Sequence, residues 1–219
     1  MNFPSEITGA IFDVDGTLLN SMKVWEGLAE RYLMSKGITP EEGLSQKLKT
    51  CTVSQAADYY RTNYGLDLST DRIISETNDI IREFYENQAE MKPGVKELLN
   101  KFSSMKIKMC VATATDRELI VPALKRNGIY DCFCAVLCGD DVKTGKDSPE
   151  IFYKALEILK TDIKTTWVFE DALHAAETAK KAGFKVACVY DSYSHENQPE
   201  LVKLSDLYLK SFDELDLIK

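Results

Sequence analysis

The chain has 219 residues, 44% of them hydrophobic, so it can bury one main core and has length left for an insertion or a small second domain. Its net charge of −8 and isoelectric point near 5.0 argue against nucleic acid or an anionic membrane surface as the main partner. No apolar stretch approaches the roughly 20 residues of a membrane span, and the N-terminus carries no secretory signal pattern, so we expect a cytoplasmic protein.

The first predicted element is an apolar strand that ends, within residues 11–17, in two carboxylates and a glycine. Gly16 gives the chain the freedom to turn and bring Asp13 and Asp15 to one pocket. A carboxylate can attack phosphorus and become an aspartyl-phosphate, and a second carboxyl can act as general acid for the leaving oxygen. The run therefore indicates phosphate chemistry, with an ordinary acidic turn as the alternative.

Three amphipathic helices are predicted next, between the first strand and the next one. The first spans residues 21–36 and is stopped by Gly37, the second follows a capping box at Thr52 and Gln55, and the third spans residues 70–88. Their apolar stripes could be ordinary core. Because they form one block that ends at Pro93-Gly94, we expect an α/β core of residues 1–19 and 93–219 and a helical domain of residues 20–92.

Helical and strand patterns then alternate to residue 189. The predicted helices are 95–102, 116–127, 149–159 and 172–182, and the predicted strands are 106–112, a segment near Val136, 166–169 and 185–189. Such alternation is typical of an α/β protein with a parallel, Rossmann-like sheet and helices on both faces.

Polar residues stand at successive strand ends or helix starts. Thr113 follows the second strand, Lys146 precedes a helix that begins at Ser148-Pro149, and Glu170-Asp171 follows the strand 166–169. Taken singly, each has an ordinary explanation as a turn residue, a solvated charge or a helix-dipole partner. Open α/β sheets bind ligands beyond the carboxyl ends of their strands, so together these residues predict one site.

The charges of this predicted site call for a cation. Two carboxylates about 4 Å apart repel by about 4 kcal/mol at an effective dielectric near 20, and Lys146 cannot offset all of that. Oxygen-only ligands beside a phosphate favour Mg²⁺ over zinc. The expected ligands are the carboxylates of Asp13 and Asp171, the backbone carbonyl of Asp15, and waters, one of them held by Glu170.

The cysteines and histidines do not predict a second metal site. The chain has six cysteines and no Cys-x-x-Cys pair. Cys132, Cys134 and Cys138 could be imagined as metal ligands, but their alternation better fits a buried strand with reduced thiols. His174 and His195 are too far apart for a histidine cluster, and we expect both to be structural or on the surface.

These motifs resemble those of the haloacid dehalogenase superfamily, in particular its phosphatase and β-phosphoglucomutase branch. The resemblance runs from about residue 7 to residue 189 and rests on Asp13-Val14-Asp15-Gly16-Thr17, Thr113, Lys146 and Glu170-Asp171. It implies that Asp13 is the nucleophile, that Asp15 is the general acid and then the base, and that the inserted helices are a cap. It also implies that Thr113, Ala114 and Lys146 bind phosphate, while Asp13, Asp15, Glu170 and Asp171 serve the metal. Ala172, Ala175 and Asp147 depart from the serine, glycine and proline that are frequent in the family, which puts substrate fit in doubt more than chemistry.

The expected function is that of a Mg²⁺-dependent phosphatase acting on a small phosphorylated metabolite, as a monomer or weak dimer. A phosphosugar mutase is the first alternative. The family's mutases have a cap arginine and a histidine after the second aspartate, where this chain has Val53 and Trp25, so hydrolysis is favoured. The alternative of another class is a phospho-accepting signalling module or an inactive phosphate-binding protein, which would need neither a cap nor an acid at Asp15. Halide displacement would leave Asp15 and the metal-binding acids without a function. Lys49, Thr50 and Thr52 are the candidate cap residues for substrate choice.

Overall fold

The computed structural model describes residues 6–48, 51, 53–142 and 145–215. The described chain forms a six-stranded sheet in the order β3-β2-β1-β4-β5-β6, in which every pairing is parallel. The strands are β1 (Gly9–Phe12), β2 (Lys108–Ala112), β3 (Ala135–Leu137), β4 (Thr166–Glu170), β5 (Lys185–Val189) and β6 (Leu207–Leu209). The predicted α/β class with a parallel sheet is therefore confirmed.

The chain divides into two compact units, residues 1–21 with 89–219 and residues 22–88, which we call the α/β unit and the helical unit. The helices of the α/β unit are α5 (Val95–Ser104), α6 (Arg117–Arg126), α7 (Glu150–Leu159), α8 (Leu173–Lys181) and α9 (Gln198–Leu204). Those of the helical unit are α1 (Leu28–Ser35), α2 (Leu44–Lys47), α3 (Val53–Tyr64) and α4 (Thr70–Asn87).

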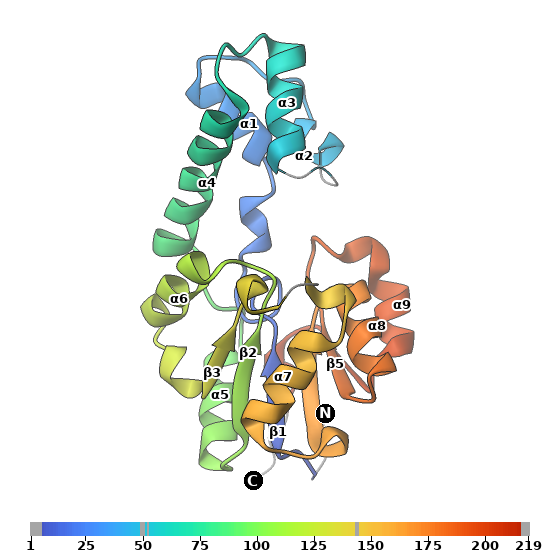
Figure 1. The fold of residues 1–219 in the computed structure, drawn as a ribbon. Helices are drawn as coiled ribbons and strands as arrows, with labels where there is room; N and C mark the ends of the chain where they lie inside the picture. Colours follow the sequence, from blue (N-terminus) through green and yellow to red (C-terminus); the bar gives the residue numbers. More distant parts are fainter. Residues whose placement is uncertain (1–5, 49–50, 52, 143–144, 216–219) are drawn as a thin grey trace. The chain divides into compact units, whose positions relative to one another are not determined.

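Helices cover the sheet of the α/β unit (Figure 1), and the side chains of the central strands alternate between two core layers. On one face, Ile11 and Val168 pack with the apolar sides of α7 and α8. On the other face, Phe12 stacks on Phe169 with ring centroids 4.5 Å apart, and the ring of Phe102 from α5 lies 6.2 Å from Phe12. Because both faces are covered, the strand interiors are almost fully apolar, and the polar residues lie at the strand ends or just beyond them.

The helical unit has its own small core. Tyr32 and Tyr60 stack with centroids 5.5 Å apart, and both lie in a buried cluster with Leu33, Leu44 and Ile73. The hydroxyl of Tyr32 remains satisfied in that core, because it donates to the Glu76 carboxylate at 2.9 Å. The unit is therefore held by its own apolar contacts.

Within the α/β unit, the chain that leads toward the helices pairs with the chain that returns from them. Leu19 and Met91 form an antiparallel bridge, the Asn20 amide donates to the Glu90 carbonyl at 2.8 Å, and the Lys92 amide donates to the Leu18 carbonyl at 2.9 Å. The turn after β1 is therefore tied to the segment before α5.

Several element boundaries differ from the predicted ones. The helix expected over 21–36 begins at Leu28, because Gly27 before it adopts a left-handed conformation with φ of 70°. The strand expected over 106–112 begins at Lys108, since Lys106 has φ of 59° and closes the end of α5. The segments α2, α9 and β6 were not predicted.

The prediction that Cys132, Cys134 and Cys138 lie in a buried strand was wrong, because β3 contains none of the three and two of them are not buried. All six cysteines are free, but Cys134 is exposed and Cys132 is half-buried, whereas Cys110, Cys138 and Cys188 are buried. Strand β3 has only three residues and lies at the edge of the sheet, so its neighbourhood is not covered as a central strand would be. His174 and His195 are exposed, as expected.

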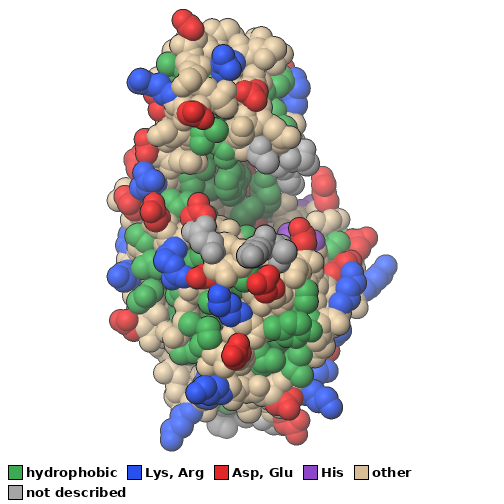
Figure 2. All heavy atoms as spheres, in the orientation of Figure 1, with side chains coloured by type: hydrophobic (Ala, Val, Ile, Leu, Met, Phe, Trp, Pro, Cys, Tyr) green, Lys and Arg blue, Asp and Glu red, His purple; other side chains and the backbone are tan. Residues whose placement is uncertain are grey.

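Lys and Arg side chains lie among Asp and Glu side chains on the face drawn in Figure 2, with no patch of one sign. Among the described residues, no helix combines the length and the apolar character that crossing a membrane requires.

Candidate active site

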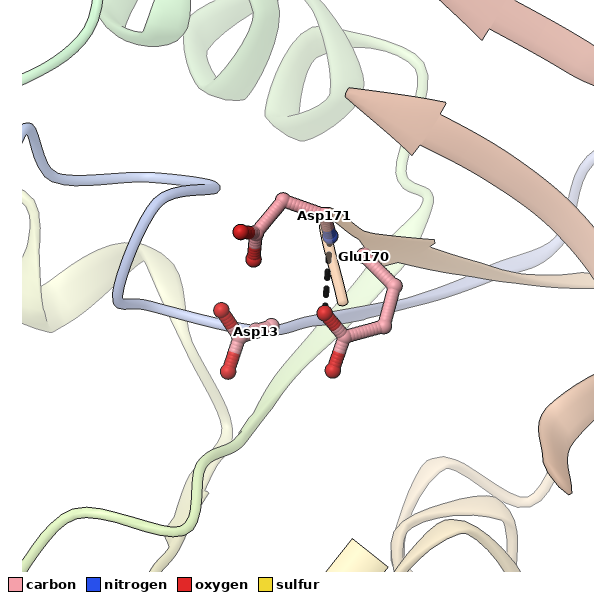
Figure 3. Close-up of side chains that lie close together, drawn as sticks. All are labelled: Asp13, Glu170 and Asp171. Atoms are coloured by element: carbon pink, nitrogen blue, oxygen red, sulfur yellow. Dashed lines mark hydrogen bonds between the residues drawn. The ribbon is translucent and has the colours of Figure 1, made fainter. Parts of the chain in front are cut away.

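The register of the neighbouring strands β1 and β4 brings three of the predicted acidic residues together. Phe12 of β1 lies opposite Phe169 of β4, and the Asp13 amide continues this ladder by donating to the Phe169 carbonyl at 3.0 Å. Glu170 and Asp171 come directly after Phe169. One carboxylate oxygen from each of Asp13, Glu170 and Asp171 lies within 4.8 Å of the others, and Figure 3 shows the three groups gathered beyond the strand ends.

Gly16 is required by this arrangement. Its φ is 81°, and a Cβ at this position would lie 2.5 Å from an Asp171 carboxylate oxygen. A larger residue would therefore push the turn after β1 away from Asp171. The freedom expected of Gly16 from the sequence is needed here for close approach as well as for the turn.

Lys146 is the cation of this buried cluster. Its ammonium donates to Asp13 Oδ1 and, at 2.6 Å, to Glu170 Oε1, and all three side chains are almost fully buried. Two of the three clustered carboxylates thus share one ammonium group, and the third, Asp171, has none among the described residues. The second oxygen, Asp13 Oδ2, is buried without any hydrogen-bond partner in the described part of the chain.

The pKa values reflect this imbalance of charge. Burial, and then the charge of Glu170, raise the pKa of Asp13 to about 8, because the single charge of Lys146 offsets them only in part. Burial and the charges of Glu170 and Asp13 raise the pKa of Asp171 well above its usual range. Burial alone would lower the pKa of Lys146, but Asp13 and Glu170 outweigh it and raise the pKa, so Lys146 is charged.

The remaining oxygens of Glu170 and Asp171 accept hydrogen bonds from backbone amides and hydroxyl groups. Glu170 Oε2 accepts the backbone amides of Asp171 at 2.7 Å and Ala172 at 3.0 Å. Asp171 Oδ1 accepts from the Thr17 hydroxyl at 3.3 Å, and its Oδ2 accepts from the Ser194 hydroxyl at 3.0 Å. Both side chains are therefore fixed before any ligand arrives.

Asp15 lies beside the same turn and is held by hydroxyl groups. Ser21 and Thr115 donate to its two oxygens, each at 2.6 Å, while the Thr113 hydroxyl lies 3.5 Å from Oδ2. Thr113 is buried directly after β2, and its amide donates to the Leu137 carbonyl at 3.0 Å. The residues that end β1 and β2 thus meet around Asp15.

The structure brings Asp13, Asp15, Thr113, Lys146, Glu170 and Asp171 to one end of the sheet. Ala114 comes after Thr113 at that end and is exposed. Lys49, Thr50 and Thr52 lie outside the described residues, so their predicted role stays a prediction.

Sequence reasoning missed four contacts of this site. Thr115 could have been found, because it stands two residues after Thr113 in the same loop. Thr17 and Ser21 lie in or just after the motif that carries Asp13, but nothing in the pattern indicated their partners. Ser194 had no local signal at all, because it reaches Asp171 from the loop after β5.

A model of the family described as haloacid dehalogenase-like hydrolase matches residues 10–189. This range includes each of the six acidic, hydroxyl and lysine side chains gathered at the sheet end. It also includes the whole helical unit.

Curated relatives match most of the chain. A protein named (DL)-glycerol-3-phosphatase 1, mitochondrial, from Arabidopsis thaliana is 30% identical over 85% of this chain, and this chain spans 65% of its length. A phosphorylated carbohydrates phosphatase from Thermotoga maritima is 27% identical, with 80% of this chain and 81% of the relative covered. The crystal structure of CbbY from Rhodobacter sphaeroides in complex with phosphate has a TM-score of 0.76 at 24% identity, covering 97% of each chain, and supports the fold.

Proposed function

Because the chain belongs to the haloacid dehalogenase-like hydrolase family, we propose that it is a Mg²⁺-dependent phosphatase of small phosphorylated metabolites. The observation that carries the proposal is the buried cluster of Asp13, Glu170 and Asp171, with Lys146 as its only ammonium group among the described residues. Relatives named as phosphatases of glycerol phosphate and phosphorylated carbohydrates support the substrate class.

In this proposal Asp13 attacks the phosphorus atom and becomes an aspartyl-phosphate, which water then hydrolyses. Lys146, already bonded to Asp13, orients the nucleophile and offsets part of the phosphoryl charge. The Thr113 hydroxyl, which lies 3.5 Å from Asp15 Oδ2, would donate to a phosphoryl oxygen. The backbone of the exposed Ala114 beside it would also contact the phosphoryl group.

Asp15 is proposed to protonate the leaving oxygen and later to take a proton from the attacking water. Its carboxylate is held by Ser21 and Thr115, so its position relative to Asp13 is set by hydroxyl donors. A general acid that is held in this way would need little reorganisation when substrate binds.

The residues present fit Mg²⁺. Asp13 Oδ2 is a buried oxygen without a hydrogen-bond partner in the described chain. The three clustered side chains that could ligate a metal all offer carboxylate oxygens, which is the ligand type that Mg²⁺ prefers. We propose Asp13, Asp171 and the carbonyl of Asp15 as direct ligands. Glu170 would act through water, because the Lys146 ammonium and two backbone amides already donate three hydrogen bonds to its oxygens. Among the described residues, each Asp171 oxygen accepts from only one hydroxyl group and keeps a lone pair for the metal. When bound, Mg²⁺ would supply positive charge against the repulsion between the anionic substrate and the carboxylates.

Removing the metal should abolish hydrolysis. We expect activity to vanish in EDTA and to return with Mg²⁺, and we expect Asp171→Asn to raise the Mg²⁺ concentration for half-maximal activity by at least about 100-fold. A titration of phosphate release against free Mg²⁺ measures this. Asp131→Asn, which changes an exposed aspartate outside the cluster, should leave the titration unchanged. Full activity in the chelator would exclude the metal role.

The metal-free protein should lose stability as the pH rises. The pKa of Asp13 is raised to about 8 in the folded protein, whereas an aspartate in an unfolded chain has a pKa of about 3.9. The folded state thus keeps a proton that the unfolded state has released, so this contribution is complete below about pH 4 and is lost as the pH approaches about 8. Urea unfolding in chelator should show a steeper fall between about pH 5 and about pH 8 for wild type than for Asp13→Asn. Parallel curves would contradict the shift.

We propose that the helical unit acts as a cap that selects the substrate. It has its own core and is inserted between β1 and α5, immediately after the turn that carries Asp15. Lys49→Ala and Thr52→Ala should change the relative kcat/KM among metabolites more than they change that for p-nitrophenyl phosphate, which offers little surface to a cap. Equal losses on every substrate would argue for a purely structural role.

The decisive experiment for the whole proposal is phosphate release from a panel of phosphorylated metabolites with Mg²⁺. Phosphate release with multiple turnovers supports the phosphatase. Conversion of a sugar phosphate to its positional isomer without phosphate release would favour the mutase, and one labelling event without turnover would favour a phospho-accepting module.

We propose a cytoplasmic location, and the six free cysteines agree with a reducing compartment.

A further inference from the structure

The loop after β5 contacts a proposed metal ligand from outside the family's motif residues. Ser194 donates its hydroxyl to Asp171 Oδ2 at 3.0 Å, while Thr17 donates to Oδ1 at 3.3 Å. Asp171 therefore has one hydroxyl donor on each oxygen. Ser194 reaches it from a segment 23 residues further along the chain.

The same loop is anchored to the turn after β1 through Lys92. The Lys92 ammonium donates to the carbonyl of Gly16 at 2.6 Å, to the carbonyl of Tyr190 at 2.6 Å and to the carboxylate of Asp191 at 2.9 Å. All three of its N–H groups are thus used, and the Lys92–Asp191 ion pair is mostly buried.

The interior of the loop is also tied together. Asp191 Oδ1 accepts the Tyr193 amide at 2.9 Å, and the Tyr190 amide donates to the Leu209 carbonyl of β6 at 2.8 Å. Ser194 therefore lies on a loop with fixed ends.

We infer that Ser194 is a positioning residue for Asp171, and that Lys92 and Asp191 anchor the Ser194 loop to the turn at Gly16. The anchor would keep the turn after β1 and the Asp171 side chain, which carry the proposed metal ligands, at a constant separation. The inference rests on the proposed function for the identity of the metal ligands. Its physical basis is that a ligating carboxylate is oriented by the hydrogen bonds that its oxygens accept from neighbouring groups. The Gly16 turn passes so close to Asp171 that a displacement of either would change the separation of Asp13 from Asp171.

The first experiment measures Mg²⁺ binding to the full chain by calorimetry, without substrate. Ser194→Ala should weaken Mg²⁺ affinity by about 10- to 100-fold, the usual effect of removing a donor one step from a metal. Ser192→Ala is the matched control, since it removes an exposed hydroxyl from the same loop. Ser194→Thr, which keeps the hydroxyl, should restore most of the affinity. At saturating Mg²⁺, Ser194→Ala should recover most of the wild-type kcat.

The second experiment tests the anchor with a double-mutant cycle. Lys92→Gln should also weaken Mg²⁺ binding, and Lys96→Gln, an exposed lysine on α5, should not. If Lys92 acts through the loop, the loss in Ser194→Ala/Lys92→Gln will be clearly smaller than the product of the two single losses. A loss equal to that product would overturn the anchor. Because Lys92→Gln leaves Asp191 without its ammonium partner, the cycle is measured at a temperature where circular dichroism shows each variant folded.

The outcomes separate this inference from the proposed function. Equal Mg²⁺ affinity in wild type and Ser194→Ala, with phosphatase activity intact, would overturn the inference alone. Weakened Mg²⁺ binding in Ser194→Ala, in a protein that hydrolyses no phosphate ester, would overturn the proposed function and leave the positioning role supported. Absence of Mg²⁺ binding to the wild type would overturn both.

Discussion

Asp13→Asn should reduce turnover of every phosphate ester by about 10⁴- to 10⁶-fold, the range measured when a hydrolase loses one member of its catalytic triad. The amide is nearly the same size as the carboxylate but cannot attack phosphorus. The variant should fold, because Lys146 keeps its contact with Glu170 and the removed charge is one that burial disfavours. Its melting temperature without metal should therefore be at or above that of the wild type.

Acid quenching after mixing with phosphate-labelled substrate tests the same step directly. Wild type should retain label on the protein, and Asp13→Asn should retain none. Asp131→Asn serves again as the control, because it makes the same change at an exposed site. Turnover within tenfold of wild type in a well-folded Asp13→Asn protein would exclude Asp13 as the nucleophile.

The residues of this site divide into those that the sequence predicted and those that only the fold reveals. Asp13, Thr113 and Glu170 stand at the ends of apolar strands, and the carboxyl ends of parallel strands meet at one edge of the sheet. Their proximity could therefore be predicted without knowing the register. Lys146 could be assigned to the same edge because it lies just before a predicted helix of the alternating pattern.

The contacts that could not be predicted are those made by loops to one another. Ser194 and Asp191 lie beyond β5, where the sequence carries no periodic pattern, and their partners stand 23 and 99 residues away. Lys92 stood out in the sequence only as the residue before a Pro-Gly turn, because a partly buried lysine cannot be told from a solvated one until its acceptors are known. Long-range polar contacts of this kind depend on loop conformation, which side-chain periodicity does not encode.

Asp15→Asn should slow formation of the phosphoenzyme from an alkyl phosphate by about 10²- to 10⁴-fold, the usual contribution of a general acid. An alkoxide is a poor leaving group and needs a proton. A p-nitrophenolate leaves without one, so the same variant should lose much less on p-nitrophenyl phosphate. The amide keeps an oxygen that can still accept from Ser21 or Thr115, so the change removes the acid while the side chain stays held.

The comparison must track the first step alone, in a rapid-mixing experiment. Asp15 is also proposed to activate the water that clears the phosphoenzyme, so steady-state rates would fall for both substrates and hide the difference. Thr115→Val is the informative companion variant: it removes a donor to Asp15 but leaves the carboxyl group, so it should slow the alkyl substrate less than Asp15→Asn does. If Asp15→Asn slows phosphoryl transfer from both substrates by the same factor, Asp15 acts on the turn or the metal rather than on the leaving group.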